Sequence, residues 1–190
     1  MDTIAAVLLA GGESKRFGRD KAEVLLGLVI DALPPRSETV LVQRRGQVPK
    51  TTRVDLVVTD DMALPDGPLR GIVAGLEAVK ADWSWVLACD LPGVDKKLLK
   101  ELLKHRSDGS LGVIPEWEGR LQPLCALYSR QSARYLRRAI EMGARSVHEA
   151  LMDPRFVRVP EKRLRELDPE GRSFVNINTP EALEEFRSEE

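Results

Sequence analysis

The sequence predicts an α/β fold: a single-domain, three-layer α/β/α sandwich around a mostly parallel, Rossmann-like sheet. Runs of β-favouring residues alternate along the chain with segments of helical periodicity. Several of these runs are apolar on both faces, which is typical of parallel strands that helices cover on both sides. A chain of 190 residues, 43% of them hydrophobic, suffices for one large core. We therefore expect a single domain over residues 1–190, with a frayed tail at 188–190.

Local composition and capping residues define the individual elements. Four apolar, β-favouring runs are predicted as strands, at residues 3–10, 39–43, 54–59 and 83–88. Three segments with apolar residues three or four positions apart are predicted as helices, at residues 69–79, 96–107 and 131–141. Pro68 suits the first turn of the first helix, and Asp95 can cap the second through its carboxylate. Thr179 and Pro180 indicate the start of a C-terminal helix.

Charge and composition exclude several classes of protein. The formal net charge is −1, which argues against non-specific binding to nucleic acid or to a membrane surface. The apolar runs are far shorter than the ~20 residues that cross a bilayer, and the N-terminus lacks the pattern of a secretory leader, so we expect a cytoplasmic protein. Cys89, Cys125 and the two histidines have no zinc-like spacing and are interpreted as structural or surface residues.

The segment LLAGGESKRFGRDKAEVLLG, residues 8–27, combines glycines and cations between two apolar runs. It is not a P-loop, because Arg19 and Asp20 follow Gly18, and it also lacks the dinucleotide pattern G-x-G-x-x-G. Adjacent glycines let a backbone approach a ligand closely, and the cations that follow can neutralise a polyphosphate. An ordinary turn with solvated charges is the alternative interpretation.

Within this segment, LAGGESKRFGRDKA resembles the signature loop of the nucleotide-diphospho-sugar-transferase-like nucleotidyltransferases, L-A-G-G-x-S-x-R-h-G-x-D-K-A, where h is hydrophobic. Every fixed position is filled. Other matching motifs are DDMALPDGPLRGIVAGL (60–76), VLACDLPGV (86–94), QPLCALY (122–128) and NINTPEAL (176–183). Together they spread the resemblance over nearly the whole chain, which is most similar to the molybdenum cofactor guanylyltransferase family, the family of molybdopterin-guanine dinucleotide biosynthesis protein A.

The resemblance implies transfer of GMP from GTP to the phosphate of molybdopterin, or of Mo-molybdopterin, with release of pyrophosphate. It also implies Mg²⁺ as the cofactor, and other proteins of cofactor biosynthesis or molybdoenzyme maturation as partners. Two alternatives stay open. One is a related nucleotidyltransferase that uses another nucleobase or a sugar-phosphate acceptor, and the other is a non-catalytic nucleotide-binding relative. The oligomeric state does not follow from the sequence.

The predicted catalytic residues are Arg16, Lys21 and Asp90. Nucleotidyl transfer to a phosphate needs charge neutralisation and in-line alignment more than a covalent nucleophile. Arg16 and Lys21 carry the charge for the polyphosphate, and the resemblance assigns the phosphate contact to Lys21 above all. By the same resemblance Asp90, which follows a predicted strand, supplies the carboxylate for Mg²⁺, an ion that prefers hard oxygen ligands. The alternative is a turn aspartate before Leu91.

The resemblance also indicates the nucleotide contacts. The predicted nucleotide-binding residues are Leu9, Ala10, Gly11, Gly12, Ser14, Lys21, Asp60 and Asp90. Gly11 favours guanine, because the related cytidylyltransferases tend to have L-A-A-G and the loss of a Cβ leaves room for a purine. Asp60 is preferred to the neighbouring Asp61 from its spacing to GPLRG, with a surface turn as the alternative for either aspartate.

The acceptor side of the site is assigned to Asn176 and Asn178 of the NINT motif, whose amides can donate and accept hydrogen bonds. Their alternative role is as helix caps or turn formers. Arg145 and Ser146 are expected on the solvated surface rather than in an acceptor pocket.

Two features depart from the family pattern. After DKAEVLLG the chain runs almost at once into LVIDALPPRSETVLVQ, so we expect a shortened first helix, which Pro34 and Pro35 end after about two turns. Gln43 stands where relatives commonly place an asparagine that contacts the nucleotide, and this contact is therefore left out of the predicted site.

Overall fold

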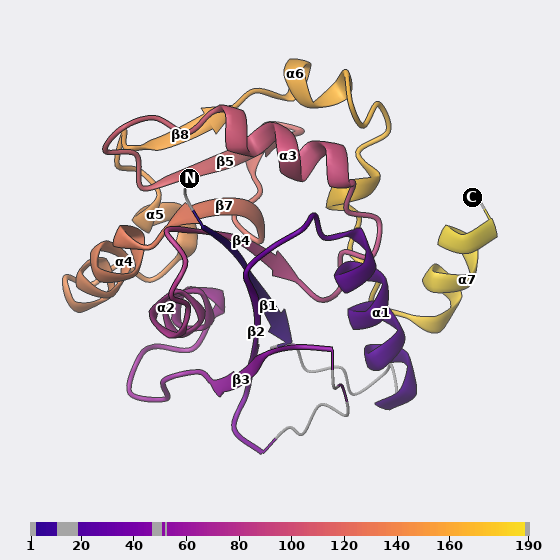
Figure 1. Cartoon of the computed structure of the whole chain (residues 1–190), viewed down its shortest axis with the longest axis horizontal. Helices are drawn as coiled ribbons and strands as arrows, with labels where there is room; N and C mark the ends of the chain where they lie inside the picture. Colours follow the sequence, from indigo (N-terminus) through magenta and orange to yellow (C-terminus); the bar gives the residue numbers. More distant parts are fainter. Residues whose placement is uncertain (1–2, 11–18, 47–50, 52, 189–190) are drawn as a thin grey trace.

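The computed structural model of the chain describes residues 3–10, 19–46, 51 and 53–188, with the side chains of the first helix from Glu23 onwards. The described strands form an eight-stranded sheet, and helices cover both of its faces (Figure 1). The strands are β1 (Ile4–Ala10), β2 (Glu38–Gln43), β3 (Leu56–Thr59), β4 (Trp83–Ala88), β5 (Gly112–Trp117), β6 (Arg120–Leu121), β7 (Cys125–Ser129) and β8 (Phe156–Val159). The helices are α1 (Arg19–Ala32), α2 (Pro68–Ala78), α3 (Lys96–Lys104), α4 (Gln131–Glu141), α5 (Val147–Ala150), α6 (Glu161–Arg165), the 3₁₀-helix η1 (Arg172–Phe174) and α7 (Pro180–Ser188).

The sheet is parallel on one side and mixed on the other. Its strand order is β3-β2-β1-β4-β7-β5-β6, with β8 also paired to β5. The first four strands in this order run parallel, whereas β7 is antiparallel to β4 and to β5. The chain leaves β1 toward β2 on one side and returns to β4 on the other, so the strand order reverses next to β1. In open α/β sheets, ligands bind at the carboxyl ends of the strands beside such a reversal.

The two faces of the sheet are covered by different helices, as Figure 1 shows with α2 and α4 on one side and α1, α3 and α7 on the other. Successive residues of β1 point alternately to the two cores: Val7 packs in the cluster with α2 and α4, and Leu8 packs in the cluster with α1 and α3. This alternation confirms the prediction of apolar strands covered on both faces. Gly75 lets α2 approach closely, because a Cβ there would lie 2.2 Å from Val7 Cγ1.

The predicted length of the first helix, about two turns, is wrong. α1 spans 14 residues, close to four turns, because it already begins at Arg19, at the DKA end of the loop motif. Four residues at helical spacing are buried: Leu25, Leu26, Val29 and Ile30. Through this apolar face α1 packs against the rest of the protein. The two prolines do end the helix, which stops at Ala32.

The other predicted elements are present with small shifts at their ends. β4 and α4 have the predicted bounds, while α3 ends at Lys104 and β3 begins at Leu56. Pro68 is the first residue of α2, as predicted. The Asp95 carboxylate caps α3 by accepting a hydrogen bond from Lys97 N at 2.5 Å. Thr179 Oγ1 accepts one from Ala182 N at 3.2 Å and so caps α7.

Ser188, which was predicted to belong to a frayed tail, is the last residue of α7, and residues 189–190 lie outside the described part of the chain. None of the helices in the described ranges is both long and apolar enough to cross a membrane.

Candidate active site

The carboxyl ends of the parallel strands bring the described candidate residues to one edge of the sheet. Leu9 and Ala10 end β1, Gln43 ends β2, Asp60 follows β3, and Asp90 follows β4. These four strands are adjacent and parallel, so their last residues lie along the same edge. Residues far apart in the sequence therefore meet where the fold class predicts a ligand site.

Part of the predicted site lies outside the described residues. Gly11, Gly12, Ser14 and Arg16 fall between β1 and α1, in the range that the structure does not describe. Lys21 belongs to α1, but its side chain is also outside the described part. The contacts of these residues with phosphate and base stay predictions.

Asp90 provides a half-buried carboxylate at this edge. Its Oδ1 is buried and has no hydrogen-bond partner among the residues that the structure describes. Burial raises the pKa of this carboxyl above its usual range. The loop is held in place by its backbone, because Cys89 N donates to Leu9 O at 3.1 Å. An unpaired, desolvated carboxylate oxygen is a natural ligand for a hard cation.

The donor set around Asp90 fits Mg²⁺ better than a metal that needs a protein cage. Among the described residues, no group of three or more histidine, cysteine, aspartate or glutamate side chains could hold a metal ion. Mg²⁺ is commonly bound by one or two carboxylates, with waters and substrate phosphates as the other ligands. Asp90 is therefore the residue that would hold this ion, with the rest of the coordination left to substrate.

The NINT motif lies beside Asp90. Ile177 N donates a hydrogen bond to Asp90 O at 2.8 Å, and the Ile177 side chain is buried at 3% exposure. Asn176 and Asn178 flank this anchor and are both exposed. Thr179 caps α7, so the asparagines are not needed as helix caps. The structure thus brings the two predicted acceptor residues next to the predicted metal ligand.

A second set of contacts holds the C-terminal segment against the loop after Asp90, and no local pattern of residues predicted it. Asp95 N donates to Ser173 Oγ at 3.0 Å, and the Asp168 carboxylate accepts from Ser173 N at 2.8 Å. Gly93 lies against this segment with no room for a side chain, since a Cβ would be 2.9 Å from the Phe186 ring. Asp95 and Ser173 are 78 residues apart in the sequence.

The geometry distinguishes Asp60 from Asp61. The Asp60 side chain is 9% exposed; its Oδ2 accepts from Arg70 Nε at 2.5 Å, while its Oδ1 is buried without a partner in the described part of the chain. The Asp61 side chain is 40% exposed. Its carboxylate accepts hydrogen bonds from Ala63 N and from Arg137, and both lower its pKa. Asp60 therefore has the free buried oxygen that a ligand contact requires, and the geometry favours it.

Gln43 is a residue that sequence reasoning left out. Its backbone O accepts from Asp60 N at 3.1 Å, which places the two residues side by side. Its Oε1, like Asp60 Oδ1, is buried and lacks a partner among the described residues. At the position where the resemblance leads us to expect an asparagine, the chain thus has a longer amide, whose Oε1 lies at the same edge as Asp60.

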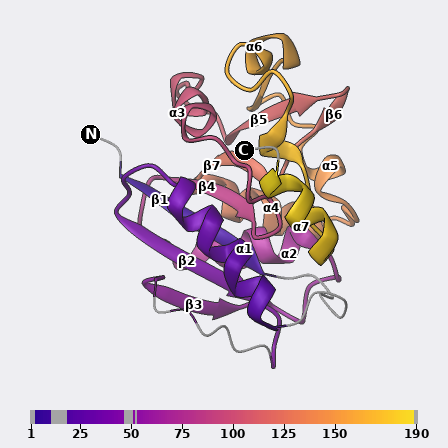
Figure 2. The same cartoon turned by 90° about the vertical axis from the view of Figure 1, so that its right-hand side faces the viewer.

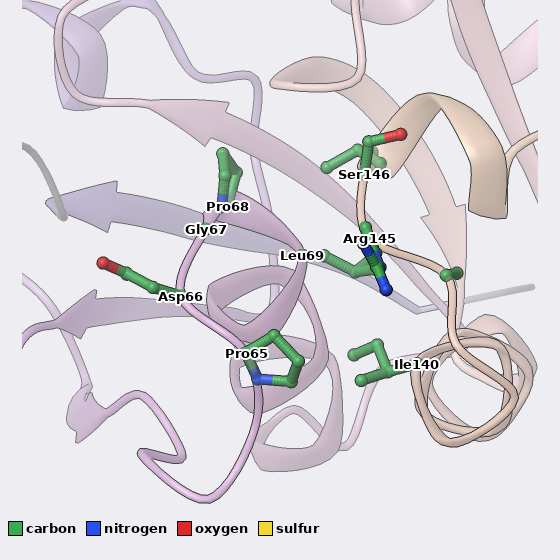
Figure 3. A pocket seen from close by; sticks show the side chains of 10 residues that line it. Pro65, Asp66, Gly67, Pro68, Leu69, Ile140, Arg145 and Ser146 are labelled. Atoms are coloured by element: carbon green, nitrogen blue, oxygen red, sulfur yellow. The ribbon is translucent and has the colours of Figure 1, made fainter.

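A small pocket opens at the start of α2 (Figure 3). Residues 65–69 form one wall, and Arg145 and Ser146, in the loop before α5, face them from the other side. The space inside measures about 30 Å³, room for little more than one water-sized group. Arg145 is exposed, as predicted, but it lies at the rim of a pocket and not on a featureless surface.

The comparisons with known proteins decide the family. Residues 6–155 match the model of the MobA-like NTP transferase domain. The chain belongs to this family. A molybdenum cofactor guanylyltransferase from Desulfosudis oleivorans is 35% identical over 97% of this chain and 94% of its own length. One from Pseudomonas putida is 32% identical over 94% of this chain and 95% of its own length.

Solved structures agree with this assignment. Molybdopterin-guanine dinucleotide biosynthesis protein A from Archaeoglobus fulgidus superposes with a TM-score of 0.77 at 30% identity, covering 97% of each chain. A 2-C-methyl-D-erythritol 4-phosphate cytidylyltransferase from Thermus thermophilus, at 17% identity over 99% and 98% of the two chains, shares the fold with a TM-score of 0.66. The predicted fold class and the predicted enzyme class, a nucleotidyltransferase, are both confirmed.

The environments of the two cysteines of this MobA-like domain disfavour the thiolate form. Burial raises the pKa of both thiols, to about 12 for Cys125 and higher still for Cys89, where the neighbouring Asp90 charge adds to the effect. Because the thiolate is the reactive form of cysteine, a raised pKa argues against a role for either thiol as a nucleophile. This agrees with their interpretation as structural residues and with direct attack by an acceptor phosphate.

Proposed function

We propose that this nucleotidyltransferase transfers GMP from GTP to the phosphate of molybdopterin, forming molybdopterin guanine dinucleotide and pyrophosphate. The observation that carries the proposal is the buried Asp90 Oδ1, which has no hydrogen-bond partner in the described part of the chain and whose residue is bonded through its backbone to Ile177 of the NINT motif. The guanylyltransferases that match the chain over nearly its whole length support the choice of substrates. Because GTP is the donor, we propose the cytoplasm as the compartment.

The reaction exchanges one phosphate bond for another. An oxygen of the acceptor phosphate forms a bond to the α-phosphorus of GTP, the bond from that phosphorus to the bridging oxygen breaks, and pyrophosphate leaves with the electron pair. Charge neutralisation and alignment supply most of the rate in such transfers. Mg²⁺, when bound, neutralises charge on the phosphates; we propose Asp90 as its protein ligand and Arg16 and Lys21 as the cations for the polyphosphate.

We assign the remaining groups by where they lie on the edge of the sheet. We assign the contacts with the nucleoside to Leu9, Ala10, Gln43 and Asp60. Leu9 and Ala10 end β1, Gln43 ends β2 and Asp60 follows β3, and the strands β2 and β3 lie on the side of β1 away from β4. Asn176 and Asn178 belong to the acceptor, next to Asp90. Arg145 would add a cation for an anionic acceptor group if that group extends to the pocket at the start of α2.

The direct test measures pyrophosphate release while GTP, CTP and ATP are each combined with molybdopterin and with simple sugar phosphates. We expect release only from GTP with molybdopterin, and only with Mg²⁺ present. Asp90→Asn keeps the shape of the side chain but removes its charge, so we expect a loss of at least about 100-fold in turnover without loss of fold. Lys104→Gln, a change on the exposed end of α3, is the control and should retain turnover.

Equal release from CTP would refute the choice of guanine. Release with sugar phosphates but not with molybdopterin would assign the chain to another acceptor class. Tight GTP binding with no turnover on authentic acceptor would indicate a non-catalytic nucleotide-binding relative. Full turnover of Asp90→Asn would remove Asp90 from the metal site.

A further inference from the structure

Arg70 lies at the centre of an ion-pair network at the nucleotide edge of the sheet. It is in the first turn of α2, with a side chain only 11% exposed. Its Nε donates to Asp60 Oδ2 at 2.5 Å, and its Nη2 lies 3.2 Å from Asp66 Oδ1. Asp66 also meets Arg44 at 3.2 Å, next to the end of β2. The charges thus alternate from Asp60 through Arg70 and Asp66 to Arg44.

One side of this network ends in two unsatisfied oxygens. Asp60 Oδ1 and Gln43 Oε1 are both buried and have no hydrogen-bond partner among the described residues. They come from adjacent strands, and the hydrogen bond from Asp60 N to Gln43 O, 3.1 Å long, holds their backbones together. Two neighbouring acceptors therefore point to a ligand that brings hydrogen-bond donors.

Stability alone does not account for this arrangement. Buried polar groups in folded proteins nearly always have partners, because an unsatisfied acceptor loses its hydrogen bonds to water without replacement. Arg70 satisfies Asp60 Oδ2 and fixes the plane of the carboxylate, yet none of the described residues pairs with the other oxygen. A guanidinium that holds one carboxylate oxygen and leaves the second available preorganises an acceptor for a ligand.

We propose that Arg70 is a positioning residue for nucleotide binding: it holds Asp60 through Oδ2 and thereby presents Oδ1, beside Gln43 Oε1, to hydrogen-bond donors of the nucleoside. The inference rests on the proposed function only for the identity of the nucleotide. A guanosine nucleotide has two sources of such donors, the N1–H and 2-amino group of the base and the hydroxyls of the ribose. Arg70 also connects this contact to the pocket at the start of α2, whose wall includes Asp66.

The test is a double-mutant cycle on nucleotide affinity, measured by titration calorimetry without acceptor. The proteins are the wild type, Arg70→Met, Asp60→Ala and the double variant, and the ligands are GTP, inosine triphosphate (ITP), which lacks the 2-amino group, and 2′-deoxy-GTP. We expect each single variant to bind GTP about tenfold more weakly, the loss of one preorganised polar contact. Because Arg70 acts through Asp60, the double variant should bind no more weakly than Asp60→Ala.

Discrimination between the ligands separates a positioning role from a merely structural one. We expect Arg70→Met to lose the preference of the wild type for GTP over ITP if the base is the donor, or over 2′-deoxy-GTP if the ribose is. Arg137→Met is the matched control. Arg137 also pairs with carboxylates, those of Asp61 and Glu77, but it lies on α4 and touches neither unsatisfied oxygen, so its removal should leave all three affinities unchanged.

Several outcomes would overturn the inference: unchanged affinities and preferences in Arg70→Met, losses that add in the double variant, or a wild type that binds none of the three nucleotides. If Arg70→Met does not fold, Arg70→Lys and the double variant, which leaves no unpaired buried charge, carry the same test. The proposed function fails separately, in the turnover assay of the wild type, if pyrophosphate release does not require molybdopterin.

Discussion

Gly93→Ala should weaken both the fold and the acceptor half of the site. Gly93 lies in the loop between Asp90 and α3, and its backbone does not have a positive φ, so alanine causes no backbone strain there. The added Cβ would lie 2.5 Å from Arg172 O and 2.9 Å from the Phe186 ring. Ordinary contact begins at 3.4 Å, so the loop and the C-terminal segment must separate by about 0.9 Å at the carbonyl.

The segment that must move is held firmly. The Asp168 carboxylate accepts hydrogen bonds from Arg172 N at 3.0 Å and Ser173 N at 2.8 Å, and Ser173 Oγ binds Asp95 N at 3.0 Å. Overpacking against such a neighbour typically costs about 1–3 kcal/mol. For a protein of this size each kcal/mol lowers the melting temperature by about 2–4 °C, which gives a fall of about 2–12 °C.

Calorimetry measures the melting temperature, and pyrophosphate release measures the effect on the site. Separation of the loop from the C-terminal segment at Gly93 would displace Ile177 of the NINT motif. We therefore expect a higher KM for the acceptor and a nearly unchanged KM for GTP. Gly27→Ala is the control, because its Cβ would lie 3.6 Å from Arg53 Nη1, and alanine favours the helix α1. A melting temperature and an acceptor KM equal to those of the wild type would refute the reasoning, as would an equal loss in Gly27→Ala.

Two further predictions concern stability. Hydrogen bonds from Lys104 and Arg163 lower the pKa of Glu101 to about 2 in the folded protein. The Glu101 carboxylate therefore contributes its full stabilisation above the unfolded pKa of about 4.3, and this contribution is lost as the pH falls toward 2. Glu101→Gln should therefore lower the free energy of unfolding by about 1–3 kcal/mol at pH 7 and flatten its pH dependence between about pH 2 and 4.3. Urea titrations monitored by circular dichroism measure both effects. Parallel pH profiles of the variant and the wild type would contradict this prediction. Asp95→Ala removes the cap of α3 and should cost about 1 kcal/mol in the same assay, with Asp95→Ser recovering most of it; a loss that serine does not recover would point to a contact other than the cap.

The sequence was most informative about the parallel half of the sheet. β1, β2, β3 and β4 are apolar and β-favouring, and all four were predicted near their observed bounds. The antiparallel half was not predicted strand by strand. β6 has only two residues, and β8 has four with mixed burial, so neither carries a clear pattern of its own. Their positions follow from pairing with distant strands, which local periodicity does not contain.

The candidate site shows the same division between local and distant information. Asp90 was predicted from the resemblance of its segment to the family motif, together with its place after an apolar strand. Asp60 was preferred to Asp61 from its spacing to GPLRG, and the difference in burial between the two side chains, which the sequence does not contain, favours the same choice. Gln43 was left out because it stands where the resemblance leads us to expect an asparagine, and its contact with Asp60 across the sheet has no local signal in the sequence. No local signal could reveal that Arg70, ten residues after Asp60, meets its carboxylate.

The corrected length of α1 has a consequence for the acceptor half. Leu25, on the buried face of α1, forms a small apolar cluster with Ile177, Leu183 and Phe186, and Figure 2 shows α7 beside α1. The NINT motif is therefore held from two sides: Ile177 is bound to Asp90 through its backbone and packs toward α1 through its side chain. A helix of two turns ending at the prolines would have left out the first half of α1, where Leu25 lies. The helix that follows the predicted nucleotide loop thus also supports the segment that carries the predicted acceptor residues, Asn176 and Asn178, so one element connects the two halves of the predicted site.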